Sequence, residues 1–169
     1  MGLFTLDKEP EVSPAPPAIP GATVADLVTG PPRVVYGSTA LTEVKRLLRA
    51  ELSGALPVID LDRVLVGIVT EHDLVLRAYS EDKPVTALLA RDVMTTHPHG
   101  VRLDDSIETL IRKMDRYGLR WVPVVDEQRR VVGLVSLGDI AQRADGDPGL
   151  RGVLAHVASR RSFWDRLWQ

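Results

Sequence analysis

Residues 56–73 read LPVIDLDRVLVGIVTEHD, and residues 122–139 read VPVVDEQRRVVGLVSLGD. The second stretch begins 66 residues after the first and carries proline, aspartate and glycine at the same places. The correspondence runs without a gap from Asp26 and Asp92 to Ala78 and Ala144. A repeat of this length indicates two copies of one supersecondary unit, each too small to bury its apolar face alone. Functional sites are therefore expected between the copies.

Each copy predicts a short strand, a helix, two strands and a second helix. In the first copy, residues 33–36 are extended, because prolines precede them. Ser38 or Thr39 is expected to cap the following helix, whose apolar residues recur at helical spacing over 41–48. The second copy predicts the same order of elements, and this order makes the fold class α+β.

In the second copy, the cap of the first helix is expected at Asp104 or Asp105, and Gly118 is placed to end that helix. The β-rich runs 122–126 and 131–135 are separated by a polar turn and predict paired strands. A helix is expected to follow the last strand of each copy.

Composition narrows the function. The chain has 169 residues, 44% of them hydrophobic, a net charge of −2 and a pI near 6.1. This charge supplies no general field for nucleic acid, so any anion must be held locally. The absence of cysteine excludes disulfides, thiolate catalysis and cysteine-ligated metal centres. No leader pattern and no apolar run of about 20 residues is present, so the sequence predicts a soluble, cytoplasmic protein.

The chain divides into five segments. Residues 1–21 are rich in proline and are expected to form a flexible arm. The first copy takes 22–80, a connecting helix or linker 81–91, and the second copy 92–145. Residues 146–169 hold two of the three tryptophans and are expected to form an amphipathic helix.

A hydroxyl and a carboxylate recur together in the pattern G-x-x-[ST]-x-x-D, as Thr70 with Asp73 and Ser136 with Asp139. The hydroxyl is placed where a strand turns into a helix, beside unpaired N–H groups that favour a phosphate. The carboxylate, one turn later, is suited to accept hydrogen bonds from a ribose diol. The same spacing is also that of a capping box, in which both groups only satisfy the backbone. The pattern alone leaves both interpretations open.

These motifs together resemble a pair of cystathionine-β-synthase (CBS) domains, also called a Bateman module. The resemblance covers about residues 22–145 and is carried by residues 56–60 and 122–126, by the two hydroxyl–carboxylate motifs, and by residues 92–95. It implies tandem CBS repeats that form one pseudo-twofold module and bind adenine nucleotides in the clefts between them.

The resemblance also implies which residues form the two sites. The site of Asp139 is expected to gather Thr29, Val34, Gly54, Ala55, Leu134 and Ser136. The site of Asp73 is expected to gather Ile68, Thr70, Thr95, Gly100, Arg120 and Trp121.

The two predicted sites differ. Arg120 is suited to form charge-assisted hydrogen bonds with an oxyanion. Trp121 beside it can stack on a base or fill the pocket, and packing is the more common role of such a tryptophan. The first copy has Gly54 and Ala55 at these positions, so the Asp139 site is expected to have more room but no matching cation.

Other chemistry is not indicated. The pair His97 and His99 flanks a proline without further ligands, which does not favour a metal site. No serine lies in a nucleophile elbow, so no enzyme is predicted. Basic residues of the second copy are largely cancelled by acidic neighbours, which leaves nucleic-acid binding a minor option.

The sequence therefore predicts a non-catalytic regulatory module that senses an adenine nucleotide or related adenosyl ligand, with no required cofactor or metal. A homodimer is expected, with no transmembrane segment and with a possible protein partner at the C-terminal tail. The alternative is a ligand-free dimeric scaffold that recruits a partner through its termini.

Overall fold

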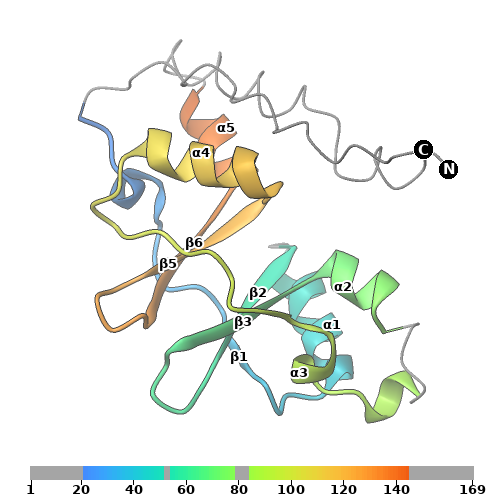
Figure 1. The fold of residues 1–169 in the computed structure, drawn as a ribbon. Coiled ribbons are helices and arrows are strands. Elements are labelled where there is room, and N and C mark those ends of the chain that lie inside the picture. Colours follow the sequence, from blue (N-terminus) through green and yellow to red (C-terminus); the bar gives the residue numbers. More distant parts are fainter. Residues whose placement is uncertain (1–20, 52–53, 79–83, 145–169) are drawn as a thin grey trace, which may run out of the picture.

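A computed structural model describes residues 21–51, 54–78 and 84–144, which form two lobes (Figure 1). The elements of the first lobe are β1 (Val35–Tyr36), α1 (Leu41–Glu51), β2 (Ala55–Ile59), β3 (Leu65–Thr70), α2 (Glu71–Leu76), the 3₁₀ helix η2 (Val85–Ala87), α3 (Ala90–Val93) and β4 (Thr95–Thr96). The elements of the second lobe are the 3₁₀ helix η1 (Val24–Leu27), α4 (Ile107–Tyr117), β5 (Trp121–Val125), β6 (Val131–Ser136) and α5 (Leu137–Ala144). This mixture of helices and strands confirms the predicted α+β class.

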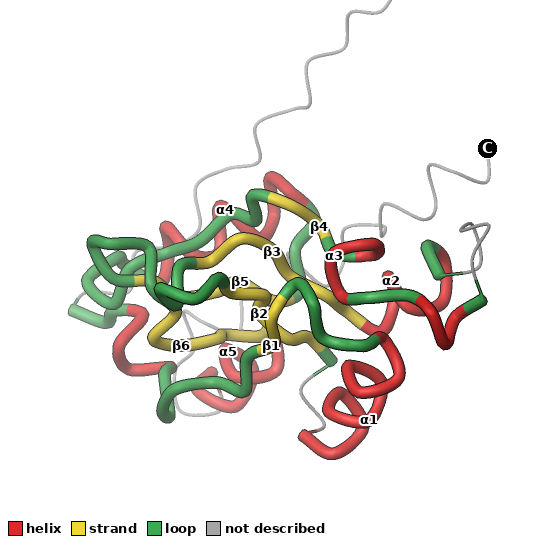
Figure 2. The backbone as a smooth tube through the Cα atoms, turned by 90° about the horizontal axis from the view of Figure 1, so that it is seen from below, coloured by secondary structure: helices red, strands yellow, loops and turns green. Residues whose placement is uncertain are grey.

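The strands follow the same pairing in both lobes. The labelled strands of the first sheet lie in the order β1-β2-β3-β4 (Figure 2). β1 is parallel to β2, and the other pairs are antiparallel. In the second lobe β5 and β6 are antiparallel. Val101 bridges Val124 in parallel, just as Val35 pairs with Val58 one repeat earlier. The repeat seen in the sequence is therefore a repeat of strand pairing.

The two hairpin turns are also copies. The Oδ1 atom of Asp60 accepts a hydrogen bond from the N–H of Val64 at 2.9 Å. Asp126 Oδ1 accepts the equivalent bond from the N–H of Arg130 at 2.8 Å. An aspartate that accepts from the backbone ahead of it fixes a tight turn, which explains its presence after each β-rich run.

The segment that begins each copy packs in the lobe of the other copy. Thr23 bridges Ser106 in the second lobe, and Leu89 bridges Ala40 in the first lobe. β4, which opens the second copy, pairs with β3 of the first copy. The packed lobes therefore exchange the segments that lead into each copy.

Each lobe has its own core, and a smaller one lies between the lobes. The buried residues of the first lobe are Val35, Leu41, Val44, Leu48, Leu56, Val58, Val69, Ala78, Leu88, Ala90 and Val93. Those of the second lobe are Val24, Leu27, Val101, Ile107, Leu110, Ile111, Met114, Val122, Val124, Val135 and Ile140. Ile59, Leu65 and Val131 form the third cluster, with Val34 and Val125 packed against it.

Backbone hydrogen bonds join the two hairpins across this third cluster. The N–H of Leu65 donates to the carbonyl of Arg129 at 2.9 Å, and the N–H of Val131 donates to the carbonyl of Arg63 at 3.3 Å. We call the contact formed by these bonds and the third cluster the seam. Because the bonds are related by the repeat, the seam has approximate twofold symmetry.

Two predicted helix caps were wrong. The N-cap of α4 is Ser106, whose hydroxyl accepts from the N–H of Thr109 at 3.2 Å, and not Asp104 or Asp105. The carboxylate of Asp105 instead accepts from the N–H of Arg102. Neighbouring residues that all cap well cannot be ranked by local pattern, so the backbone direction decides.

At α1, Thr39 also has another role than the predicted one. Its hydroxyl accepts from the N–H of Tyr36 at 3.0 Å, and the helix begins only at Leu41. The prediction that Gly118 ends α4 is confirmed, because this glycine has the left-handed backbone with φ 64° and ψ 34°.

Among the described residues, no helix is long and apolar enough to cross a membrane. The predicted arm at 1–21, apart from Gly21, and the predicted C-terminal helix at 146–169 lie outside the described residues, as does the start of the connecting segment 81–91.

Candidate functional site

The two hydroxyl–carboxylate motifs lie where β3 turns into α2 and where β6 turns into α5. We call these places the Thr70 corner and the Ser136 corner. At the first, Thr70 Oγ1 donates to Asp73 Oδ2 at 2.7 Å and accepts from the N–H of Asp73 at 3.3 Å. At the second, Ser136 Oγ donates to Asp139 Oδ2 at 2.7 Å and accepts from the N–H of Asp139 at 3.1 Å.

The same Oδ2 atoms also accept from the N–H of Thr70 at 2.8 Å and of Ser136 at 2.7 Å. Both motifs are therefore closed capping boxes in this structure. The cap uses one carboxylate oxygen only, so capping and ligand binding differ in what the second oxygen, Oδ1, does.

The second oxygen distinguishes the corners. Asp73 Oδ1 lies 3.3 Å from Arg77 Nε, and the Asp73 side chain is only 6% exposed. Asp139 Oδ1 has no hydrogen-bond or ion-pair partner among the described residues, and Asp139 is only partly buried. The equivalent of Arg77 is Arg143, which forms no ion pair with Asp139. The Ser136 corner is thus the one with a carboxylate oxygen left to accept from a ligand.

The side chain of Trp121 lies at the junction of the two predicted sites. Trp121 begins β5 and pairs with Ser136 in the sheet. Its ring covers Gly54 of the first copy, so closely that a Cβ atom on Gly54 would lie 2.4 Å from Trp121 Cζ2. The ring is half-buried and fills space above the glycine, as the packing interpretation expects. The proposed stacking on a base stays a prediction.

The remaining predicted residues are distributed around the same strands. Thr95 pairs with Ile68, and Ala55 pairs with Thr70, in the first sheet. Val34 packs in the seam, while Thr29 and Arg120 are exposed and Leu134 is half-buried. The backbone carbonyl of Arg120 accepts from the N–H of Leu137, at the start of α5. The assignment of these residues to one ligand site or the other stays a prediction.

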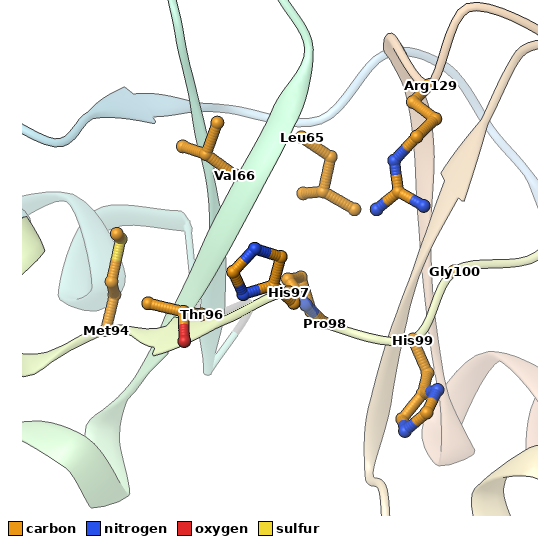
Figure 3. Close-up of a pocket in the computed structure, with 9 residues that line it drawn as sticks. All are labelled: Leu65, Val66, Met94, Thr96, His97, Pro98, His99, Gly100 and Arg129. Atoms are coloured by element: carbon orange, nitrogen blue, oxygen red, sulfur yellow. The ribbon is translucent and has the colours of Figure 1, made fainter.

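One cavity of about 670 Å³ lies away from both corners, beside the segment that connects the lobes (Figure 3). Among the predicted site residues, Gly100 lines it. His97 and Arg129 line it as well, although no sequence motif joins these two residues.

The two histidines of the connecting segment do not converge. His99 stacks on Tyr117 with ring centroids 3.7 Å apart, whereas the His97 ring lies on the side of Leu65 and Val66 (Figure 3). Within the described residues, no group of three or more metal-ligating side chains is present.

Comparison with known proteins finds relatives that are similar in sequence and in fold. The chain is 31% identical, over 127 residues, to the L-aspartate semialdehyde sulfurtransferase of Methanocaldococcus jannaschii, which covers 75% of this chain. The chain spans only 24% of the length of that enzyme.

Two solved structures are similar over nearly their whole length. The CBS domain pair of protein MJ0100, in complex with 5′-methylthioadenosine and S-adenosyl-L-methionine, has a TM-score of 0.67 and 30% identity, covering 74% of this chain and 97% of that one. The CBSX2 protein of Arabidopsis thaliana in complex with AMP has a TM-score of 0.67 and 28% identity, covering 75% and 99%.

The family model of the CBS domain matches this chain twice, over residues 24–79 and 90–146. The two matches begin 66 residues apart, which is the period of the sequence repeat, and the solved CBS pairs share the arrangement of the lobes. The chain therefore belongs to the CBS domain family and contains a tandem pair of CBS repeats.

Proposed function

We propose that this chain is a regulatory module that binds an adenine nucleotide or a related adenosyl compound between its two repeats and catalyses no reaction itself. The observation that carries the proposal is the Oδ1 atom of Asp139, which has no partner among the described residues although Oδ2 is fully used by the cap. The ligands bound by the MJ0100 domain pair and by CBSX2 support the adenosyl class.

The chemistry of the Ser136 corner suits a ribose. The two hydroxyl groups of a ribose diol can both donate to a carboxylate oxygen and replace the water there. The carboxylate charge then keeps its hydrogen bonds when the ligand covers it. The sequence grouped Trp121 and Arg120 with Asp73, but Trp121 pairs with Ser136 in the sheet. We therefore assign both residues to the Ser136 corner, where Trp121 offers an aromatic face for a purine. Arg120 is exposed and has no ion-pair partner within the described residues, so its guanidinium is available to a phosphate.

We infer a regulatory role because the seam, through which the two hairpins contact each other, is small. Three buried side chains and the hairpin hydrogen bonds join the lobes there. A ligand that contacts both lobes favours one arrangement of them over others, and only such a difference in affinity can shift a conformational equilibrium. A cytoplasmic homodimer is the expected form in which this shift is transmitted.

Isothermal titration of the full chain with AMP, ADP, ATP and S-adenosylmethionine tests the proposal. Asp139→Ala should weaken binding about tenfold or more, because it removes a charged hydrogen-bond acceptor. Asp26→Ala is the control, since Asp26 Oδ2 accepts from the N–H of Thr23 at 2.8 Å in a similar cap outside the site. Equal affinity of wild type, Asp139→Ala and Asp73→Ala would reject the assignment.

A ligand-free interaction scaffold is the second candidate, and the closed capping boxes at both corners favour it. It predicts that none of the four compounds raises the melting temperature of the protein. It further predicts that deletion of residues 148–169 abolishes binding of a protein partner in a pull-down. Retention of every partner by the shortened chain would eliminate the scaffold.

A further inference from the structure

The cavity beside the connecting segment spans both lobes. Its wall on the first lobe is formed by Leu65 and Val66 of β3 and by Met94, and Arg129 closes it from the tip of the β5–β6 hairpin. Between them passes the segment from Thr96 to Gly100, with His97 facing the same space as Arg129 (Figure 3). Its volume of about 670 Å³ lies within the range of small-molecule sites.

This cavity is separate from the two corners. Leu65 lies five residues before Thr70 in β3, and Thr96 pairs with Gly67, three residues before Thr70, so these lining residues lie roughly 10–16 Å along the strand from the Thr70 corner. Neither the two hydroxyls nor the two carboxylates of the corners line it. Gly100 is shared with the predicted Asp73 site, whereas no predicted residue of the Asp139 site lines the cavity, so a ligand there would leave the site proposed above free.

The ionisable side chains that line the cavity are all basic. Arg129 contributes a guanidinium and His97 an imidazole, while none of the described residues that line the cavity is acidic. Neither side chain has a hydrogen-bond or ion-pair partner within the described part of the chain. Leu65, Val66 and Met94 add apolar side chains to the same lining (Figure 3). The combination matches a molecule with an apolar body and an anionic end.

The backbone at both polar residues is unusual. His97 has a φ of 51° and Arg129 a φ of 62°, and Arg63 is the only other non-glycine residue with positive φ in the described ranges. Glycine or asparagine would adopt this left-handed conformation at lower cost. Arg63 and Arg129 share this backbone because both lie in the equivalent hairpin turns, where each N–H donates to the carbonyl of the turn aspartate. The positive φ of His97 has no such equivalent in the first copy, and left-handed residues of this kind occur often at ligand sites.

Comparison of the two copies explains why the cavity lies beside Gly100 of the second copy. The residues equivalent to His97 and Gly100 in the first copy are Pro31 and Val34. Val34 packs in the seam, whereas Gly100 has no side chain, and its carbonyl accepts from Lys113 Nζ at 2.7 Å. The equivalent hairpin arginine, Arg63, does not line this cavity. The chain has thus diverged at this position between the copies.

We propose that this cavity binds an organic anion, a carboxylate or a phosphate monoester on an apolar body, through Arg129 and His97. The bound molecule bridges the first sheet and the hairpin of the second lobe, and so holds the lobes together from outside the seam.

Titration of the full chain with phenyl phosphate and with benzoate, followed by amide NMR, tests this site. Either probe should shift the amide resonances of Val66, His97 and Gly100, and the tighter of the two identifies the anionic group. Benzyl alcohol, which is uncharged, should bind at least tenfold more weakly. Contacts between the phenyl protons and the Met94 methyl group should appear as nuclear Overhauser effects in the wild-type protein.

Arg129 and Arg63 have the same backbone conformation, so their glutamine variants separate an effect on binding from an effect on folding. Arg129→Gln should weaken the tighter probe about tenfold or more, whereas Arg63→Gln should leave its affinity unchanged. His97→Asn, which tolerates the left-handed backbone, should weaken it several-fold. Equal loss in both arginine variants, binding of inorganic phosphate as tight as that of phenyl phosphate, or shifts confined to Ser136 and Asp139 would overturn the proposal. The last result would leave the adenosyl site standing, so the two proposals fail separately.

Discussion

Replacement of Gly54 by alanine measures how tightly the two repeats fit together at Trp121. Gly54 has a φ of 66°, which costs an alanine about 1–2 kcal/mol. The new methyl group would also lie 2.4 Å from Trp121 Cζ2, and such overpacking adds about 1–3 kcal/mol. We expect Gly54→Ala to lower the free energy of unfolding by about 2–5 kcal/mol in total.

Gly118→Ala separates the two contributions. Gly118 has nearly the same backbone, with a φ of 64°, but nothing lies within 4 Å of the position of its Cβ. Its replacement should therefore cost only the backbone part, about 1–2 kcal/mol. Urea unfolding of both variants, followed by circular dichroism, gives the difference, expected at about 1–3 kcal/mol.

A double-mutant cycle completes the experiment. In a Trp121→Ala background the ring is absent, so the cost of Gly54→Ala should fall to that of Gly118→Ala. If Gly54→Ala costs no more than Gly118→Ala in the wild-type background, Trp121 does not pack on Gly54 and the description of the junction is wrong.

Two further predictions concern α4 and α1. Ser106→Ala should cost about 1 kcal/mol of stability by removing the N-cap of α4, whereas Asp104→Ala should change it by less than about 0.5 kcal/mol; the opposite order in urea unfolding would restore the cap expected from the sequence. A hydrogen bond from Arg46 lowers the pKa of Glu43 below its ordinary value, so the stability that Glu43 adds is present at neutral pH and is lost as the pH falls through that lowered pKa. The difference in unfolding free energy between wild type and Glu43→Gln should accordingly shrink from pH 7 to pH 3, and a difference that grows on acidification would contradict the ion pair.

The elements that the sequence predicted correctly are those set by local pattern. The repeated β-rich runs became β2 and β3 in one lobe and β5 and β6 in the other. Gly118 ends α4 because a left-handed residue is needed there, and a lone glycine after an apolar stripe indicates this need.

The features that the sequence did not predict depend on contacts between distant residues. The pairing of Thr23 with Ser106 and of Leu89 with Ala40 exchanges segments between the lobes, and no local pattern carries that information. The contact of Trp121 with Gly54 is similar, since it joins residues from different copies.

The candidate site was predicted only in part. The hydroxyl–carboxylate spacing identified both corners, and the same spacing could not tell a cap from a ligand site. The difference between Asp73, paired with Arg77, and Asp139, with a carboxylate oxygen left over, required the three-dimensional structure. Arg77 and Arg143 are identical in the repeat, so the sequence did not distinguish the two carboxylates, although it did distinguish the residues around them.

A crystal structure of the full chain grown with AMP, or with 5′-methylthioadenosine, tests the adenosyl site most directly. We expect a ribose within hydrogen-bond distance of Asp139 Oδ1, with its base beside Trp121. A saturated complex in which the ligand lies elsewhere, with Asp139 Oδ1 bonded only to water, would contradict it.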